Sequence, residues 1–511
     1  MLAKILSAAV LGIDAYVVEV EADISQQLPA FATVGLPDGA VKEAKERVAA
    51  AIKNSDYVFP AKKITINLAP ADIRKEGSAF DLPIAVGILG ATGQILRDDF
   101  DSFVMVGELS LDGTLKPVPG ILPIAIQIAK KENSAMIVPK ENAMEAAIAT
   151  GLEVYPLGSL RDTVDFLEDG SGVKPYRIDV DEVFSQALNY PMDFSDVKGQ
   201  ETAKRALEVA AAGGHNLLMV GPPGSGKTML ARRLPTILPN LTMEEALDVT
   251  KIYSVAGLLP ANTALIATRQ FCSPHHTISD AGLIGGGRVP KPGQVSLAHH
   301  GVLFLDEMPE FRKDILEMLR QPMEDGQVTI SRSMISLTYP SQFMLVGAMN
   351  PCPCGFFGDP NHDCTCNPGQ IQKYMSKVSG PLLDRIDIHI EVPAVKFKDL
   401  AAEPTGEKSD EIRERVNHAR KIQLMRFNSE EKMFCNAHME SKDLQKYCPL
   451  DNKSLELLRT AITKLGLSAR AYDRIIKVSR TIADIEAEER IQTRHISEAI
   501  QYRSLDRNLW M

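Results

Sequence analysis

The sequence predicts an α/β protein of several domains, organised around a phosphate-binding domain. Three observations support this fold class. An apolar run at residues 217–220 is followed directly by a glycine-rich loop and a helix-like segment. A second apolar run ends in the adjacent carboxylates Asp306 and Glu307. Strand-like and helix-like segments alternate over the first third of the chain, whereas the part after about residue 408 has the spacing of helices.

The overall composition excludes several classes of protein. A chain of 511 residues is too long for a single hydrophobic core, and its 45% hydrophobic and 24% charged residues are ordinary for a globular protein. No apolar run reaches the roughly 18 residues that a membrane span requires, so we expect no membrane association. A formal net charge of −10 argues against a uniformly basic nucleic-acid-binding surface, but it leaves room for a local basic channel.

The N-terminus superficially resembles a signal peptide, because residues 1–11 are mostly apolar. The segment 16–23 follows at once with the alternation of a strand, and it places Glu19, Glu21 and Asp23 on one side. We therefore interpret the N-terminus as a first β-strand and expect a cytoplasmic protein. The seven cysteines, an odd number, agree with a reducing compartment rather than a disulfide framework.

Residues 1–170 are predicted to form one domain of mixed strands and helices. Strands are expected at 16–23, 63–68 and 103–106, and helices at 40–52 and 82–89. Their order is too irregular for a doubly wound sheet, so the domain is expected to be α/β or α+β. The polar, glycine-containing stretch 171–190 is predicted to be a linker.

Two segments of this first domain, 68–85 and 107–120, resemble the protease domain of the Lon family. Enzymes of that type use a serine that a nearby lysine activates. Ser78 lies near the expected nucleophile position, but the family's glycine-proline-serine-alanine-glycine context is absent. Residues 121–124, Ile-Leu-Pro-Ile, stand where the family carries its lysine. The resemblance therefore implies a Lon-like fold without peptidase activity, in which Ser78 is structural.

The loop after the apolar run 217–220 carries the most specific motif of the chain. Residues 221–228 match the pattern G-x-x-x-x-G-K-[ST] between a strand and a helix, where backbone N–H groups can face a pyrophosphate. Lys227 is expected to reach the terminal phosphates of ATP, and Thr228 is expected to bind Mg²⁺. A plain glycine turn before a helix is the alternative. The predicted nucleotide-binding residues here are Gly221, Pro222, Pro223, Gly224, Ser225, Gly226, Lys227, Thr228 and Met229.

Hydrolysis needs further groups, and two later strands supply them. Asp306 and Glu307 end an apolar strand; we expect Asp306 to coordinate Mg²⁺ through water and Glu307 to polarise the attacking water. A third strand at 343–349 ends at Asn350, which is placed to orient that water against the γ-phosphate. The alternative for Asn350 is a turn residue before Pro351.

Together, these motifs resemble the core of an AAA+ ATPase of the magnesium-chelatase/MCM clade, over residues 191–395. The segment 193–200 resembles the lead-in that contacts adenine in that clade, which places Gln200 at the nucleotide. Residues 279–293 resemble the helix-2 insertion, and residues 327–338 resemble the hairpin before sensor 1.

Both insertions point at the central pore in rings of this clade. The resemblance therefore implies contacts with DNA phosphates by Arg288, Lys291 and Arg332. Solvated surface charge is the alternative for each of the three side chains.

The segment 379–387 resembles the one that gives this clade its trans-acting arginine finger, which assigns that role to Arg385. A planar, permanently charged guanidinium suits a phosphoryl transition state. The alternative is an ion pair of Arg385 with Asp384 or Asp387.

The C-terminal region, 408–511, is predicted to be a helical lid domain. Its segment 467–474 resembles the sensor-2 segment of the clade. Arg470 is the first candidate for the sensor arginine, and Arg474, one helical turn later, is the second.

Four cysteines lie close together within an insert at 350–368. Cys352, Cys354, Cys364 and Cys366 form two C-x-C pairs, and thiolates at this spacing can close a tetrahedral zinc site. A C-x-C pair is less usual in such sites than C-x₂₋₄-C, and His362 could replace one thiol. Reduced free thiols are the alternative.

Over essentially the whole chain, the combination of these domains resembles the ComM/YifB family. Its members are bacterial AAA+ ATPases that form hexameric rings, and its member ComM acts as a helicase that promotes branch migration during natural transformation. The resemblance implies a homohexameric DNA motor that uses ATP and Mg²⁺. It assigns catalytic roles to Glu307, Asn350, Arg385 and Arg470.

The sequence leaves three other functions open. The ATPase motor subunit of a metal chelatase acting on a tetrapyrrole would share the same core. An ATP-dependent protease would need the lysine that residues 121–124 lack. A nucleotide-gated scaffold would bind without turnover, which the intact Lys227, Asp306 and Glu307 disfavour.

Overall fold

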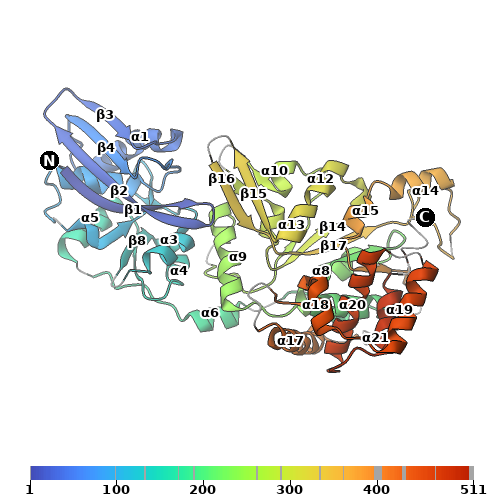
Figure 1. Cartoon of the computed structure of the whole chain (residues 1–511). Helices are drawn as coiled ribbons and strands as arrows, with labels where there is room; N and C mark the ends of the chain where they lie inside the picture. Colours follow the sequence, from blue (N-terminus) through green and yellow to red (C-terminus); the bar gives the residue numbers. More distant parts are fainter. Residues whose placement is uncertain are drawn as a thin grey trace. The chain divides into compact units, whose positions relative to one another are not determined.

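The computed structural model divides the chain into two compact units (Figure 1). Unit 1 consists of Met1–Leu188 with Met243–Ala267, and unit 2 consists of Asn189–Thr242 with Thr268–Met511. The structure describes residues 2–97, 99–131, 134–170, 172–187, 190–260, 263–287, 290–332, 335–360, 362–395, 406–428, 433–465, 468–503 and 505.

Unit 1 is built on one mixed sheet with the strand order β3-β4-β2-β1-β5-β8-β9. The predicted first strand is confirmed as β1, which pairs antiparallel with β2. On its other edge β1 pairs in parallel with β5, and the parallel pairing continues from β5 to β8 and from β8 to β9. The strands are β1 (Leu2–Leu11), β2 (Asp14–Ser25), β3 (Ala30–Val34), β4 (Lys63–Ala69), β5 (Phe103–Met105), β8 (Ala135–Pro139) and β9 (Glu153–Leu157), and a small hairpin adds β6 (Glu108–Leu109) and β7 (Leu115–Lys116).

Helices cover both faces of this sheet, because alternate strand residues point to opposite sides. Residues of α1, α2 and α5 share one hydrophobic core with one face of the sheet, and residues of α3 and α4 share a second core with the other face. The helices of unit 1 are α1 (Gly39–Asn54), α2 (Asp81–Ala91), α3 (Ile121–Ile128), α4 (Ala143–Ala146), α5 (Leu160–Asp169), α6 (Val180–Gln186) and α9 (Met243–Ala256). Helix α6 lies within the stretch 171–190 that was predicted to be a linker.

Helix α9 belongs to unit 1, although its sequence lies inside the range 191–395 that was predicted to be the nucleotide-binding core. It packs against α3. The Ser254 hydroxyl of α9 donates a hydrogen bond to the buried Glu145 carboxylate of α4, which also accepts from the Leu122 N–H at 2.9 Å. Burial raises the pKa of Glu145, and these donors act in the opposite direction. The packing and hydrogen bonds of α9 thus tie residues 243–256 to the first unit.

Unit 2 contains a parallel sheet with the order β11-β14-β17-β10-β18. Its strands are β10 (Leu217–Val220), β11 (Phe271–Cys272), β14 (Val302–Leu305), β17 (Met344–Met349) and β18 (Ile388–Glu391). The three strands that were predicted at 217–220, 302–305 and 343–349 are adjacent in this sheet. Strand order reverses at β10, and ligands of open parallel sheets bind at such a switch point. The predicted α/β class with a parallel-sheet core is confirmed.

Helices and two hairpins surround this sheet, and the C-terminal helices α17–α21 form a bundle that shares its hydrophobic core with α7 and α8 (Figure 1). The hairpins are β12 (Gly285–Gly286) with β13 (Lys291–Pro292), here named the helix-2 hairpin, and β15 (Gln327–Arg332) with β16 (Ile335–Pro340), here named the presensor hairpin. The helices are α7 (Glu201–Gly213), α8 (Lys227–Ile237), α10 (Asp280–Leu283), α11 (Gln294–Leu297), α12 (Lys313–Met318), α13 (Arg320–Asp325), α14 (Pro368–Met375), α15 (Gly380–Leu383), α17 (Ser409–Arg426), α18 (Ser441–Tyr447), α19 (Asn452–Leu465), α20 (Ala469–Ile485) and α21 (Thr493–Gln501).

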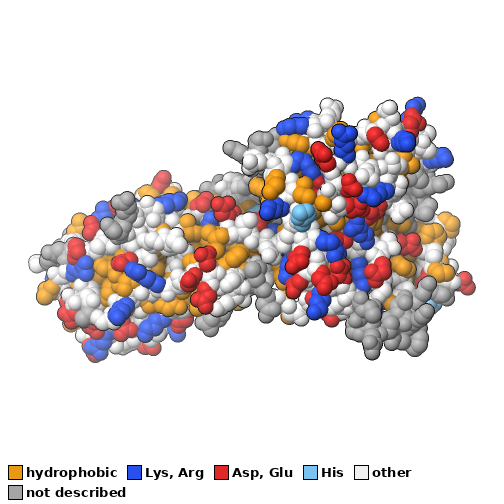
Figure 2. Space-filling view, turned by 90° about the horizontal axis from the view of Figure 1, so that it is seen from below, with side chains coloured by type: hydrophobic (Ala, Val, Ile, Leu, Met, Phe, Trp, Pro, Cys, Tyr) orange, Lys and Arg blue, Asp and Glu red, His pale blue; other side chains and the backbone are white. Residues whose placement is uncertain are grey.

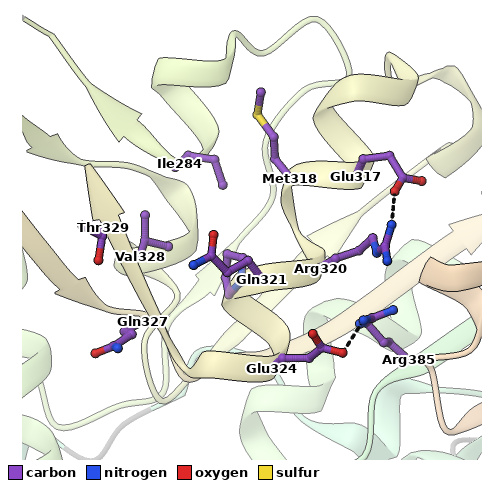
Figure 3. A pocket seen from close by; sticks show the side chains of 11 residues that line it. Ile284, Glu317, Met318, Arg320, Gln321, Glu324, Gln327, Val328, Thr329 and Arg385 are labelled. Carbon is purple, nitrogen blue, oxygen red and sulfur yellow. Dashed lines mark hydrogen bonds and ion pairs between the residues drawn. The ribbon is translucent and has the colours of Figure 1, made fainter. Parts of the chain in front are cut away.

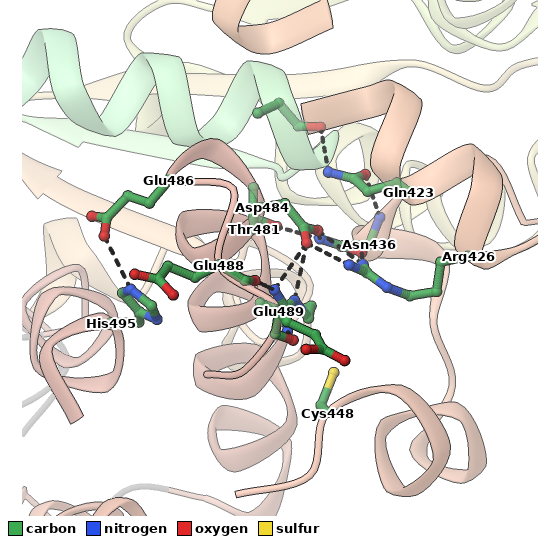
Figure 4. A network of polar contacts seen from close by, with 12 residues as sticks. Gln423, Arg426, Asn436, Cys448, Thr481, Asp484, Glu486, Glu488, Glu489 and His495 are labelled. Carbon is green, nitrogen blue, oxygen red and sulfur yellow. Dashed lines mark hydrogen bonds and ion pairs between the residues drawn. The ribbon is translucent and has the colours of Figure 1, made fainter. Parts of the chain in front are cut away.

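A buried polar network centred on Asp484 joins the helices of this bundle (Figure 4). Asp484 is fully buried, and its carboxylate accepts hydrogen bonds from Arg426 at 2.9 Å, from Arg480 at 3.1 Å and from the Asn436 side-chain amide at 2.8 Å. Gln423 extends the network, because it donates to the Ala212 carbonyl of α7 at 3.1 Å. The network therefore connects the C-terminal bundle to the phosphate-binding part of unit 2.

The variant Asp484→Asn is expected to destabilise unit 2 by about 3–5 kcal/mol, because it leaves two arginines without their buried counter-charge. Urea denaturation monitored by circular dichroism should show a lower midpoint. Asp473→Asn on the same helix is the matched control; Asp473 accepts a hydrogen bond from Ser441 in an exposed position, so a change within about 0.5 kcal/mol is expected. Equal midpoints for the two variants would contradict the importance of the network.

The surface carries both signs of charge. On the face drawn in Figure 2, basic and acidic side chains of the described residues are interspersed. This arrangement agrees with the acidic net charge and limits any nucleic-acid contact to local groups of basic residues. Among the described residues, each helix is too short or too polar to cross a lipid bilayer.

Candidate nucleotide-binding site

The phosphate-binding loop joins β10 to α8 at the switch point of the sheet. Gly224 and Gly226 have φ angles of +75° and +87°, which favour glycine. A Cβ at Gly221 would lie 2.1 Å from the Val392 carbonyl oxygen, so only glycine fits where β10 ends beside β18. These three positions explain why the motif needs glycine there. The loop leads directly into the N-terminus of α8, the kind of position at which a phosphate can bind.

Lys227 is bonded within its own loop. Its ammonium donates to the carbonyl oxygens of Gly221 at 2.7 Å and Pro222 at 2.9 Å, and it contacts the side-chain oxygen of Asn350 at 3.3 Å. Burial lowers the pKa of Lys227, while the charges of Asp306 and Glu307 raise it. The structure therefore brings together the loop lysine and the asparagine at the end of β17.

Thr228 and Asp306 meet beside the loop. The Thr228 hydroxyl donates to Asp306 Oδ2 at 2.7 Å, and the Glu307 N–H donates to Asp306 Oδ1 at 3.0 Å. A hydroxyl and a carboxylate so placed are the hard oxygen ligands that Mg²⁺ prefers, so these residues fit the predicted ion. Glu307 has a φ of +49°, which is uncommon outside glycine, and its side chain is exposed. Its carboxylate is thus accessible to water.

Gln200 lies against the same loop. Its side-chain amide donates to the Ser225 carbonyl at 2.6 Å and to the Pro393 carbonyl at 3.2 Å. Its amide oxygen is buried and has no hydrogen-bond partner among the described residues. An unpaired buried acceptor beside the phosphate loop fits a donor from the ligand, such as the adenine amino group.

Arg385 lines a pocket of about 490 Å³ whose lining includes none of residues 221–228 (Figure 3). Its guanidinium forms an ion pair with Glu324 of α13 and donates to the Pro381 carbonyl at 2.7 Å. The alternative partners named from the sequence are wrong, because Asp384 pairs with Arg470 at 3.1 Å and Asp387 pairs with Arg474.

The two sensor-2 candidates differ in their surroundings. Arg470 is 64% exposed, whereas Arg474 is largely buried against the fully buried Asp387. His215 also bonds Asp387, at 3.1 Å. Burial raises the pKa of Asp387, but Arg474 and His215 hold it below the ordinary range. Arg474 therefore has a buried structural partner, whereas Arg470 is exposed and pairs with Asp384.

The helix-2 and presensor hairpins touch one another. Gly286 of the first hairpin pairs with Lys291, and a Cβ at Gly286 would lie 3.0 Å from a terminal nitrogen of Arg332 in the second. Tyr339 on the presensor hairpin donates to the Pro290 carbonyl at 2.7 Å. The exposed Lys291 and Arg332 therefore both lie next to Gly286. Arg288 lies outside the described residues.

The four cysteines of the insert converge. The sulfur of Cys352 lies 3.3 Å from that of Cys354 and 3.7 Å from that of Cys364, and all four sulfurs lie within 4.8 Å of one another. All four are free thiols. His362 instead contacts Asp359 at 3.4 Å and stacks on Phe356. Four sulfurs can therefore complete a tetrahedral metal site without His362, and we name them the cysteine cluster.

Ser78 in unit 1 has a local partner that fits a structural role. Its hydroxyl donates a hydrogen bond to the Glu108 carboxylate. The nearby Lys75 is fully buried, and its ammonium donates to the Ile73 carbonyl at 2.7 Å.

Sequence reasoning missed Glu324, the partner of Arg385, because no motif distinguishes it within the polar run before the presensor hairpin. It also missed the close approach of Gly355 to Pro223, where a Cβ would lie 2.6 Å from the proline ring. The glycine at position 355 was the signal in the sequence that could have indicated this close approach.

Three family models match the chain. The model described as "Magnesium chelatase, subunit ChlI" matches residues 193–400, "Subunit ChlI of Mg-chelatase" matches residues 20–142, and "Magnesium chelatase, subunit ChlI C-terminal" matches residues 406–503.

Full-length relatives are also similar. The competence protein ComM of Haemophilus influenzae is 44% identical over 513 residues, which cover 99% of this chain and 98% of that protein. The YifB protein of Escherichia coli is 44% identical over 504 residues, covering 98% and 97%. The magnesium-chelatase 67 kDa subunit of Chlorobaculum parvum is 31% identical over 164 residues, covering 31% of this chain and 23% of that protein.

Proposed function

Because this chain belongs to the ComM/YifB family of magnesium chelatase-like AAA+ proteins, we propose that it is an ATP-hydrolysing motor that acts on DNA as a hexameric ring. Its reaction would be helicase-driven branch migration or strand exchange during recombination and natural transformation. We propose ATP and Mg²⁺ as cofactors and zinc as a structural ion of the cysteine cluster. Both ATP supply and reduced cysteines suit the cytoplasm, which we propose as its location.

One subunit contributes most of a hydrolytic site. Lys227 would hold the γ-phosphate, Thr228 and Asp306 would hold Mg²⁺, and Glu307 would polarise water that Asn350 helps to orient. Arg385 has its described contacts in a separate pocket with Glu324, so it would serve the site of a neighbouring subunit. This division supports assembly as the condition for turnover.

The observation that carries the DNA assignment is the meeting of the helix-2 and presensor hairpins at Gly286. These two insertions are separate in sequence, and each brings one exposed cation, Lys291 or Arg332, next to Gly286. Paired cations of this kind suit phosphate groups of a nucleic-acid backbone. A local basic site also agrees with the acidic net charge of the chain.

The proposal is tested with a fluorescently labelled four-way DNA junction. The purified protein is incubated with the junction and ATP, and duplex product and ATP turnover are measured beside the variant Glu307→Gln. ATP-dependent conversion of the junction into duplexes, together with DNA-stimulated ATP turnover, is expected. Absence of both activities in a protein that still binds ATP would overturn the proposal.

Replacing Lys291 or Arg332 by alanine is expected to weaken DNA binding about 3- to 10-fold on all sequences, because each change removes one phosphate contact. The slope of log K against log salt concentration should fall by about 1 for each variant. Fluorescence anisotropy at several salt concentrations measures both quantities. Lys453→Ala on α19 is the matched control, since Lys453 is an exposed lysine away from the hairpins. Equal slopes in all three variants would contradict the assigned contacts.

The family-model descriptions favour one second candidate, the ATPase motor of a metal chelatase. In that case DNA would not change ATP turnover, and the protein would support ATP-dependent metal insertion into a tetrapyrrole.

A further inference from the structure

The sulfur positions of the cysteine cluster fit a single tetrahedral ion. Zinc–thiolate bonds of about 2.3 Å place the sulfurs of a tetrahedral site about 3.8 Å apart. The sulfur of Cys364 lies 3.7 Å from that of Cys352 and 3.6 Å from that of Cys354, close to this value, and the Cys352–Cys354 separation is shorter, at 3.3 Å. The separations are far longer than the roughly 2.05 Å of a disulfide. One ion bound by four thiolates accounts for the arrangement.

The backbone around the sulfurs is shaped for such an ion. Gly355, with a φ of +88°, turns the chain directly after Cys354, and its N–H donates to the Cys352 carbonyl at 3.0 Å. Cys352 itself is fully buried.

The cluster lies between two parts of the nucleotide site. It follows Asn350, whose side-chain oxygen lies 3.3 Å from the Lys227 ammonium. On its other side, Gly355 lies so close to the phosphate loop that an added Cβ would be 2.6 Å from Cδ of Pro223. An ion that fixes the turn at Gly355 would therefore also fix the loop and the asparagine.

We propose that the four cysteines bind one zinc ion, and that this ion holds the phosphate-binding loop in its nucleotide-binding shape. Nucleotide affinity would then depend on the metal at a site that touches no phosphate. The inference rests on the proposed function only in taking residues 221–228 as the ATP site.

The metal part is tested on the full chain by elemental analysis. The wild-type protein is expected to carry one zinc per chain, and the double variant Cys352→Ser/Cys364→Ser is expected to carry none. Nucleotide affinity, measured with a fluorescent ATP analogue, should fall at least 10-fold in the double variant. Iron in place of zinc, or unchanged zinc in the double variant, would overturn the assignment.

The proposed effect of the ion on the phosphate-binding loop, here called the brace, is tested with a variant that keeps every sulfur. Gly355→Ala should retain one zinc per chain but bind the fluorescent ATP analogue at least 10-fold more weakly, because the new methyl group displaces Pro223. Gly358→Ala is the matched control: its φ is +80°, but a Cβ there meets no atom within 4 Å. It should stay within twofold of the wild type.

Wild-type affinity in Gly355→Ala with zinc present would overturn the brace. Misfolding of the cysteine double variant would also lower ATP affinity. The two glycine variants avoid this ambiguity, because they keep all four cysteines, and circular dichroism and zinc content show the state of each protein. These assays contain no DNA. If the junction assay fails while nucleotide affinity still depends on the zinc site, only the proposed DNA motor function is rejected.

Discussion

The variant Glu307→Gln is expected to lower ATP turnover by about 10²- to 10⁴-fold, because an amide cannot accept a proton from the attacking water. Binding of ATP should be retained, since the Lys227 contacts and the Thr228–Asp306 hydrogen bond do not involve the Glu307 side chain. Phosphate release measures turnover, and a fluorescent ATP analogue measures affinity. Turnover should fall while the affinity for the ATP analogue is retained.

The matched control for this variant is Glu310→Gln. Glu310 follows closely in the same loop and pairs with Lys377 at 3.2 Å, so its replacement should change turnover less than about twofold. Equal losses in both variants, or a loss of ATP affinity in Glu307→Gln, would contradict the role of Glu307 as the group that polarises water.

The variant Arg385→Ala is expected to lower turnover by about 10³- to 10⁵-fold, the effect of removing an arginine finger. Its own phosphate loop remains intact, so ATP affinity should stay within a few-fold of the wild type. Arg385→Lys should rescue little, because an ammonium lacks the planar donors of a guanidinium. Phosphate release and ATP binding are again the measurements.

Mixing the two inactive proteins distinguishes action between subunits from action within one. A subunit with Arg385→Ala keeps Glu307, and a Glu307→Gln neighbour keeps Arg385, so a mixed ring contains complete sites. Turnover should therefore reappear on mixing. If the mixture stays as inactive as its components while the subunits still assemble, Arg385 does not act across an interface.

The phosphate-binding loop could be predicted because its determinants are local. A strand, two glycines with positive φ and a helix start lie within one short segment, and β10 has the predicted bounds Leu217–Val220. The meeting of Thr228 with Asp306 also followed, because parallel strands place their carboxyl ends at one edge.

Contacts between distant segments could not be predicted in this way. The partner of Arg385 is Glu324, 61 residues earlier, whereas the sequence suggested the nearby Asp384 or Asp387 as the alternative to an arginine finger. The amphipathic spacing of a helix shows that one face is buried, but it does not show against which unit. For this reason α9 was assigned to the nucleotide-binding core. The approach of Gly355 to Pro223 depends on packing of the same long-range kind.

The position of α9 means that neither unit corresponds to one uninterrupted stretch of coding sequence. The chain crosses between the units after residues 188, 242 and 267. A fragment that begins at residue 190 would keep α9 but lose α3, against which it packs. The unit that contains the phosphate-binding loop therefore cannot be cut out of the chain as one contiguous fragment without including α9. Truncation, recombination between genes and proteolytic trimming act on both units together.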